Sequence, residues 1–235
     1  MLLKNKLTHK TSNDGILIKN RKLIYIALVP FIISMALNFP FPHKNPYGEA
    51  VVLVLNIPLR TVNGFHYVGF ASFLLLIASL YLLVKSLGKY HFRFVLIAIV
   101  ASIFIPPIVA NIIQKTIATG IYAISYQSEE SNCNFEMKNE TTLHGICELP
   151  FENYNRGNTQ FTVEFYEHYP FEDDIQILSL MNNDAPYEVT LRGKERKRVI
   201  IETDIDISQM KNHIDAAHAR DVTIIIKSGE KIRKL

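Results

Sequence analysis

Acidic and histidine side chains that could hold a metal ion stand at three places in the second half of the chain. Glu172-Asp173-Asp174 is a run of carboxylates, and Asp204 and Asp206 alternate along a predicted strand. Ca²⁺ prefers such oxygens, but neither group has the spacing of a calcium loop. His213 and His218 would lie about 140° apart on a helix and so would not share one face. We therefore predict no metal site and no cofactor.

Motifs of the common enzyme classes are absent from the sequence. There is no glycine-rich phosphate loop, no G-x-S-x-G nucleophile motif, no H-E-x-x-H zinc motif and no zinc-finger spacing. Serine, histidine and aspartate occur, but no local pattern brings them together. These observations favour a protein that is not an enzyme.

The two cysteines, Cys133 and Cys147, lie symmetrically about residue 140. Apolar and polar residues alternate from Cys133 to Met137, and a second such run goes from Leu143 to Leu149, which predicts a hairpin with its turn at 138–142. In this hairpin the cysteines would face each other. A disulfide there closes a loop of about 15 residues and would contribute roughly 3 kcal/mol, provided that the compartment is oxidising.

A second candidate group is the basic run from 192 to 198, which holds Arg192, Lys194, Arg196, Lys197 and Arg198. Such a run attracts anionic surfaces, for example lipid headgroups or an acidic wall polymer. It is also typical of the solvated turn of a hairpin, here between strands that end near Leu191 and begin near Val199. Both interpretations stay open.

Three stretches are long and apolar enough to cross about 30 Å of hydrocarbon. They cover about residues 23–41, 65–87 and 94–113, and the apolar pattern after the third predicts a helix that extends to about residue 126. Pro106-Pro107 predicts a kink in that helix. For the first stretch, a retained anchor is favoured over a cleaved signal peptide ending near Ser34-Met35-Ala36.

Between the first two stretches lies a proline-rich loop, residues 42–64. Its apolar run Ala50–Ile57 is too short to span a membrane, so it would lie in the interface or re-enter it. One interpretation is a lid or docking surface, and the other is a short helix that covers the outer ends of the spans. The polar side chains available for contacts are His43, Glu49, Arg60 and His66.

The distribution of charge predicts the orientation. Residues 1–22 carry six basic and one acidic side chain, a net of +5, and residues 85–93 carry three basic ones. Because basic segments stay on the cytoplasmic side, both are predicted to be cytoplasmic. The chain from residue 127 onward has 13 basic and 20 acidic side chains, a net of −7, and is predicted to be extracytoplasmic. An oxidised cysteine pair agrees with that placement.

Residues 131–235 show the alternation and turn residues of an antiparallel β protein. We expect strands over Thr159–His168, Ile175–Met181, Tyr187–Leu191 and Val199–Thr203, with a short helix or loop over Ser208–Arg220. Roughly seven short strands at this spacing predict an immunoglobulin-like β-sandwich. The fold class is therefore an α+β membrane protein with three transmembrane helices followed by an extracytoplasmic antiparallel β-sandwich.

The sequence favours a multi-pass cell-membrane protein whose outer domain binds a protein, a polymer or a lipid headgroup. Its partners would be the lipid bilayer and that outer ligand, and the charge pattern gives no nucleic-acid footprint. The alternative is an accessory subunit of a transporter or of an envelope-assembly complex that acts through its helices. An intramembrane enzyme is disfavoured, because the spans lack paired acidic, histidine or metal-ligand residues.

Overall fold

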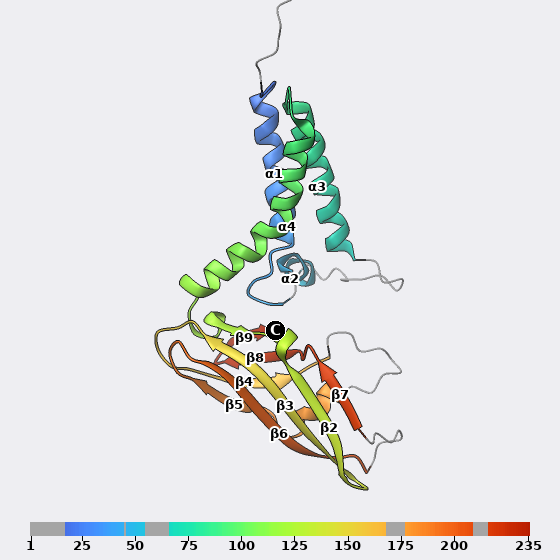
Figure 1. Cartoon of the computed structure of the whole chain (residues 1–235), viewed down its shortest axis with the longest axis vertical. Helices are drawn as coiled ribbons and strands as arrows, with labels where there is room; N and C mark the ends of the chain where they lie inside the picture. The colour runs from blue at the N-terminus through green and yellow to red at the C-terminus, as the bar shows by residue number, and fades with distance from the viewer. Residues whose placement is uncertain (1–16, 45, 55–65, 168–176, 209–215) are drawn as a thin grey trace, which may run out of the picture. The chain divides into compact units, whose positions relative to one another are not determined.

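The computed structural model describes residues 17–44, 46–54, 66–167, 177–208 and 216–235. The chain divides into two compact units (Figure 1). One, which we call the helical unit, comprises residues up to Phe39 and Gly48–Pro106. The other, the β unit, comprises Pro40–Tyr47 and Pro107–Leu235. The segment Pro40–Tyr47 therefore belongs with the sheets, although it lies between two helices in the sequence.

The helices are α1 (Arg21–Leu37), α2 (Tyr47–Val54), α3 (Tyr67–Ser86) and α4 (His91–Thr116). By length and composition α3 and α4 can cross a membrane, and only 17% and 11% of their most apolar windows are buried. A core helix of a soluble protein would be mostly buried, so these two helices indicate membrane association. The helix α1 has 17 residues and is similarly apolar.

Small residues spaced seven apart hold α1 against α3. The hydroxyls of Ser34 and Ser72 lie 3.1 Å apart, and Ser79 donates to the carbonyl of Ala27 over 2.9 Å. At the far end the backbone N–H of Asn20 donates to the carbonyl of Ser86 over 3.0 Å. Small residues let helix backbones approach closely in a membrane, and a seven-residue repeat keeps them on one face. The two helices thus pack antiparallel along their whole length.

The third span does not continue as one helix to residue 126. The helix α4 ends at Thr116 and is followed by the 3₁₀ helix η1 (Gly120–Ala123) and the strand β1 (Ile124–Tyr126). Gly120 has a φ of +61°, which favours glycine and ends the helical path. The prediction failed because Ile117, Ile121 and Ile124 repeat at helical spacing, yet Ile121 and Ile124 are buried in the β unit.

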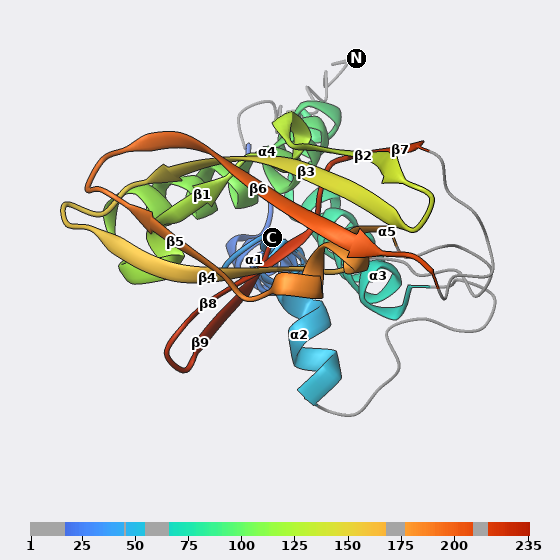
Figure 2. The same cartoon turned by 90° about the horizontal axis from the view of Figure 1, so that it is seen from below.

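The β unit contains two antiparallel sheets (Figure 2). In the five-stranded sheet, β3 (Thr142–Asn153) pairs with β1 and with β2 (Asn132–Asn139) along one edge and with β6 (Arg196–Asp206) along the other. The edge strand β7 (Ala216–Arg220) pairs with β2. The four-stranded sheet has the order β5-β4-β8-β9, which are Tyr187–Leu191, Thr159–Phe165, Ile224–Ser228 and Lys231–Lys234.

One hydrophobic core joins the two sheets. The rings of Phe151 on β3 and Phe161 on β4 meet edge to face with centroids 5.4 Å apart, and both side chains are buried. Gly145 leaves room for this packing, since a Cβ there would lie 2.6 Å from the sulfur of Met181. Inward residues alternate with outward ones on β4 and β5, as the sequence predicted.

Three predicted elements differ in the structure. The strand expected over Ile175–Met181 is helical where described, as α5 (Ile177–Leu180) and η3 (Met181–Asp184). Residues 216–220, expected in a helix or loop, form β7, so His218 lies on a strand, while His213 is outside the described residues. The basic turn is shorter than expected, because β6 already begins at Arg196.

Candidate functional site

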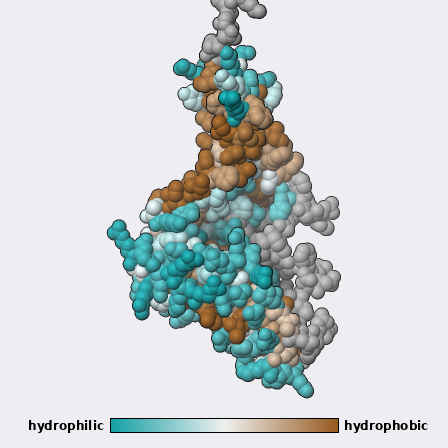
Figure 3. All heavy atoms as spheres, in the orientation of Figure 1, coloured by the Kyte–Doolittle hydropathy of each residue, from teal (hydrophilic) through white to brown (hydrophobic). Residues whose placement is uncertain are grey.

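The outward face of the five-stranded sheet carries an exposed apolar side chain among charged ones. Ile200 on β6 is 58% exposed and stands opposite Glu148 of β3 in the strand register. Ile146 lies on the same face of β3 and is half-buried. Figure 3 shows a small hydrophobic patch on the otherwise hydrophilic surface over this sheet. Isolated exposed apolar residues are common on protein surfaces, so the side chains around Ile200 decide whether it marks a binding surface.

Charged side chains beside Ile200 are paired across the strands. Arg198 donates to Glu148 over 2.9 Å. Asp204 accepts from Lys138 over 2.7 Å and lies 2.6 Å from Nδ1 of His144. These hydrogen bonds, first from Lys138 and then from His144, hold the pKa of the Asp204 carboxyl below its usual value. An apolar centre with a rim of mutually satisfied polar groups is the usual anatomy of a protein-binding surface.

The outward face of the five-stranded sheet holds two histidines, His144 and His218, which do not form a metal site. His218 Nδ1 lies 2.6 Å from the side-chain oxygen of Asn134, and Arg220 donates to the other ring nitrogen over 3.0 Å. Within the described part of the chain, no three His, Cys, Asp or Glu side chains are placed to hold a metal ion. The carboxylates Glu172-Asp173-Asp174 lie outside that part.

The predicted basic run is divided between a turn and a strand. Arg196 contacts Gln127 at 2.8 Å and Glu130 at 3.6 Å, and Lys194 donates to the carbonyl of Tyr154 over 2.6 Å. Arg198 is bound to Glu148, as described above, so much of the positive charge has a partner within the sheet. Arg192 and Lys197 are exposed. A contact with an anionic surface stays a prediction for these residues.

The four polar residues of the outer loop are not brought into one site. His43 belongs to the β unit, Glu49 lies on α2, His66 precedes α3, and Arg60 is outside the described residues. The backbone N–H of Lys234 donates to Nδ1 of His43 over 3.1 Å. Burial lowers the pKa of His43, and the nearby charges of Arg233 and Lys234 lower it further. His43 therefore acts as a structural acceptor.

Arg233 is a buried cation that joins three segments of the β unit. Its guanidinium donates to the carbonyls of Pro42, Ile121 and Ile124, the last over 2.5 Å. Only 6% of the residue is exposed, and burial lowers its pKa to about 10. The planar guanidinium of arginine has five N–H donors in a fixed geometry and so can hold several carbonyls at set positions, whereas lysine has three donors on a rotating group. Arg233 thus ties the segment after α1 and the segment after α4 to the last strand.

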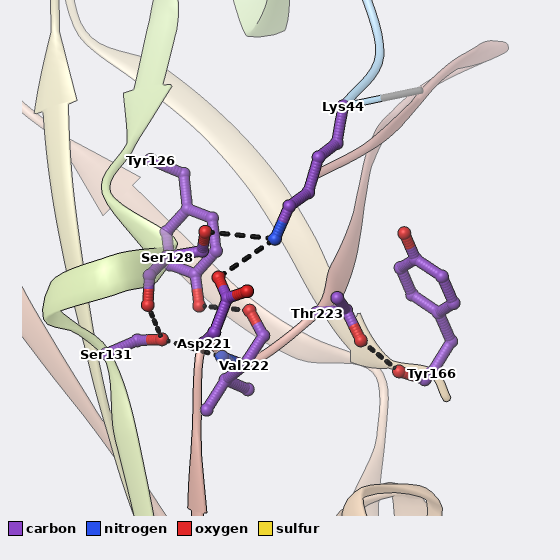
Figure 4. A network of polar contacts seen from close by, with 8 residues as sticks. All are labelled: Lys44, Tyr126, Ser128, Ser131, Tyr166, Asp221, Val222 and Thr223. Atoms are coloured by element: carbon purple, nitrogen blue, oxygen red, sulfur yellow. Dashed lines mark hydrogen bonds and ion pairs between the residues drawn. The ribbon is translucent and has the colours of Figure 1, made fainter. Parts of the chain in front are cut away.

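A second network ties the same loop segment to the sheets (Figure 4). Lys44 contacts Asp221 at 2.9 Å and Ser128 at 3.1 Å, and its backbone N–H donates to the carbonyl of Lys234 over 2.9 Å. Tyr126 donates to the carbonyl of Val222 over 2.7 Å, and its burial raises its pKa. These contacts hold the loop segment around Lys44 against the sheets of the β unit.

The paired cysteines lie inside the five-stranded sheet. Cys133 on β2 and Cys147 on β3 are direct partners in the register, their Cα atoms are 4.0 Å apart, and they are joined as a disulfide. Both are fully buried in the core that the two sheets share. The bond links neighbouring strands and leaves the outward face unobstructed.

The described residues also line two hollows, one in each unit. An open groove of about 490 Å³ lies on the four-stranded sheet, where Lys227 contacts Glu164 at 2.6 Å beside Gln160, Thr162 and Glu188. In the helical unit an apolar cleft of about 230 Å³ lies between α1, α3 and α4, lined by small and aliphatic residues that include Ala27, Ala98 and Ala101.

Comparisons with known proteins give no relative: no family model, no curated protein and no solved structure matches this chain. Sequence reasoning missed both Ile200 and Arg233. The run Val199-Ile200-Ile201 contained the signal for the first, because one of three consecutive apolar residues in an alternating strand must face outward.

Proposed function

We propose that this chain is an integral membrane protein with three spans, which holds an antiparallel β-sandwich on the extracytoplasmic side as a protein-binding module. The observation that carries the binding proposal is Ile200, a large apolar side chain that is 58% exposed on the edge strand β6. The nearby charged residues Arg198 and Glu148 on the same face are already paired with each other. Binding energy at protein interfaces concentrates in a few buried anchors surrounded by polar contacts.

The third span is supported by the pairing of α1 with α3. Since α1 runs beside α3 from Asn20 to Ser34, it would cross the same thickness of hydrocarbon as its partner. Its 17 residues give about 25 Å of helix, within the lower range for a span. The basic segments at 1–22 and 85–93 favour a cytoplasmic amino terminus. The disulfide in the β unit agrees with an oxidising compartment outside.

The sandwich proposal is supported by the two sheets and their single core. An immunoglobulin-like form remains part of this proposal. The attachment of Pro40–Tyr47 and of η1 to β9 through Arg233 would fix the module firmly to both connecting segments.

The test replaces the proposed anchor and a matched residue. Ile232 on β9 is also an isoleucine of a strand in the β unit and is 48% exposed. Burying an isoleucine contributes about 1.5–3 kcal/mol, so Ile200→Asp should weaken binding by about ten- to a hundredfold. Ile232→Asp should leave binding unchanged.

The measurement is photo-crosslinking in intact cells with a crosslinkable amino acid at Glu202, which neighbours Ile200 on the same face. A defined adduct that is formed by the parent chain and by Ile232→Asp, and lost in Ile200→Asp, supports the proposal. If the same adduct forms at full yield in Ile200→Asp, the assigned face is incorrect.

A second candidate function is that of an accessory subunit acting through the helices, favoured by the apolar cleft beside Ala98 and Ala101. Small residues such as Ala27, Ala98 and Ala101 leave a hollow between larger apolar side chains, into which an apolar side chain of another membrane helix could pack. Replacing the three spans by one unrelated anchor distinguishes the two ideas. Loss of the crosslinked adduct with an intact β unit supports the accessory role, whereas a retained adduct supports the binding module.

A further inference from the structure

Two basic segments, far apart in sequence, are held together at one end of the helical unit. The backbone N–H of Lys19 donates to the carbonyl of Ser86 over 2.8 Å, and that of Gly88 donates to Leu17 over 3.0 Å. Ile18 and Leu87 form the bridge between them. The start of α1 and the link between α3 and α4 therefore meet at the same end (Figure 1).

This pairing collects six cationic side chains, which we call the basic end: Lys19, Arg21, Lys22, Lys85, Lys89 and Arg93. Residues 17–26 and 81–97 contain no aspartate or glutamate. The first turns of α1 and α4 likewise have no acidic residue. A concentration of one sign of charge raises the local concentration of anions.

Exposed aromatic rings lie among the cations of the basic end. Tyr81 and Tyr90 are 58% and 55% exposed, and each ring lies beside a cation: Lys85 Nζ is 4.7 Å from the first and Arg93 Cζ is 5.1 Å from the second. Phe92 is 79% exposed. Figure 3 shows the hydrophilic end directly above the hydrophobic girth of the helices. Cations and exposed aromatic rings next to an aliphatic surface match the headgroup and interface region of a bilayer, which adjoins its hydrocarbon core.

We propose that the basic end binds the phosphate groups of anionic phospholipids in the cytoplasmic leaflet. The inference deepens the proposed function and rests on it in that the helices sit in a bilayer with this end on the cytoplasmic side. Arginine forms bidentate hydrogen bonds with phosphate, and lysine adds point charge. Lipid is favoured over a soluble anion because the cations adjoin exposed rings and aliphatic side chains. Each basic residue near an anionic surface contributes about fivefold to the affinity.

The test measures lipid retention by the full chain, purified in a non-ionic detergent, with native mass spectrometry. Phosphatidylglycerol is the anionic probe, phosphatidylcholine the zwitterionic one, and inorganic phosphate the soluble competitor. The variant Arg21→Gln/Lys22→Gln/Lys85→Gln/Arg93→Gln removes four cations. The matched control, Lys138→Gln/Arg156→Gln/Arg220→Gln/Lys231→Gln, removes four exposed cations from the β unit that lie outside the basic run 192–198.

We expect the parent chain and the control to retain phosphatidylglycerol at least tenfold over phosphatidylcholine, and the first variant to lose this preference. The double variant Lys22→Gln/Lys85→Gln should lower retention by more than tenfold and serves if the fourfold variant does not fold. Unchanged retention in a folded variant overturns the proposal, as does complete displacement by inorganic phosphate. Failure of the β unit to crosslink a partner leaves this readout unaffected, so the two proposals fail separately.

Discussion

Ile121 and Ile124 should be as important for the β unit as its central strands, although they precede the region with a clear strand pattern. Both are fully buried, and Ile124 opens β1, which pairs with the end of β3. Replacing a buried isoleucine by alanine costs about 2–5 kcal/mol, through lost burial and the cavity left behind. Ile117, only four residues before Ile121, is 72% exposed and is the matched control.

For a unit of this size, about 1 kcal/mol shifts the thermal midpoint by roughly 3–5 °C. We expect Ile121→Ala, in the full chain in detergent, to lower the midpoint followed by near-ultraviolet circular dichroism by about 10 °C. Ile117→Ala should change it by less than about 2 °C. Equal midpoints for the two variants would refute the assignment of η1 and β1 to the β core.

The same reasoning applies to fragments. A soluble fragment that begins at Ser131 lacks Ile121 and Ile124, whose burial contributes about 3–6 kcal/mol together. That amount is comparable with the whole stability of a small domain, about 5–15 kcal/mol. A fragment that begins at Ile117 should therefore melt at a much higher temperature than one that begins at Ser131. Indistinguishable melting of the two would count against the same assignment.

Three further predictions concern other contacts. Replacing Cys133 and Cys147 by alanine should destabilise the β unit by about 3 kcal/mol or more in thermal melts, whereas a reducing agent should leave the melting of that variant unchanged. Because the pKa of His43 is lowered in the folded state, the unfolded chain binds a proton more readily, and stability should fall as the pH drops below about 6.5. The variant His43→Asn keeps an acceptor for the backbone N–H of Lys234 and should remove that part of the pH dependence. An unaltered dependence of stability on pH in His43→Asn would refute this prediction. Ser72→Leu should separate α1 from α3 and lower the melting temperature of the helices. The control is Ser102→Leu, because the Ser102 hydroxyl donates to the carbonyl of Ile99 in its own helix. Equal melting temperatures of the two variants would disprove the pairing of α1 with α3.

The sequence pattern alone predicted the strands in which apolar and polar residues alternate regularly. Phe161, Val163 and Phe165 share the buried face of β4 as expected, and the hairpin of β2 and β3 has the register that places Cys133 opposite Cys147. In these strands most inward residues are apolar and most outward ones polar, with Ile146 and Thr159 as exceptions, so a period of two identifies the face without any tertiary information.

Tertiary contacts decided the elements that sequence reasoning missed. Residues Ala216–Arg220 have no β-branched side chain and favour a helix, yet they pair with β2 as an edge strand. In β9 the apolar Ile232 faces outward and Arg233 faces inward, because four backbone carbonyls accept from its guanidinium. From residue type alone, Ile232 would be expected to face inward and Arg233 outward.

The outer loop was predicted in part from its sequence pattern and depends in part on tertiary contacts. Its apolar run was expected to be an interfacial segment or a short helix, and α2 covers Tyr47–Val54. The close approach of Gly48 to Leu37 and Val68 is visible only in three dimensions, since a Cβ there would lie 2.6 Å from Val68 Cγ1. Similarly, the attachment of His43 and Lys44 to the last strand joins positions about 190 residues apart in the chain.

The central claim, a membrane protein with its β unit outside and its basic end inside, is tested most directly by labelling single cysteines in intact cells with a membrane-impermeant maleimide. Gly157 is open to solvent, and a Cβ there would meet no atom within 4 Å, while Lys22 is exposed at the basic end. The native cysteines are buried in a disulfide and should not react. Gly157→Cys should be labelled without permeabilisation and Lys22→Cys only after it. Labelling of Lys22→Cys in intact cells, or protection of Gly157→Cys until the membrane is opened, would contradict the account.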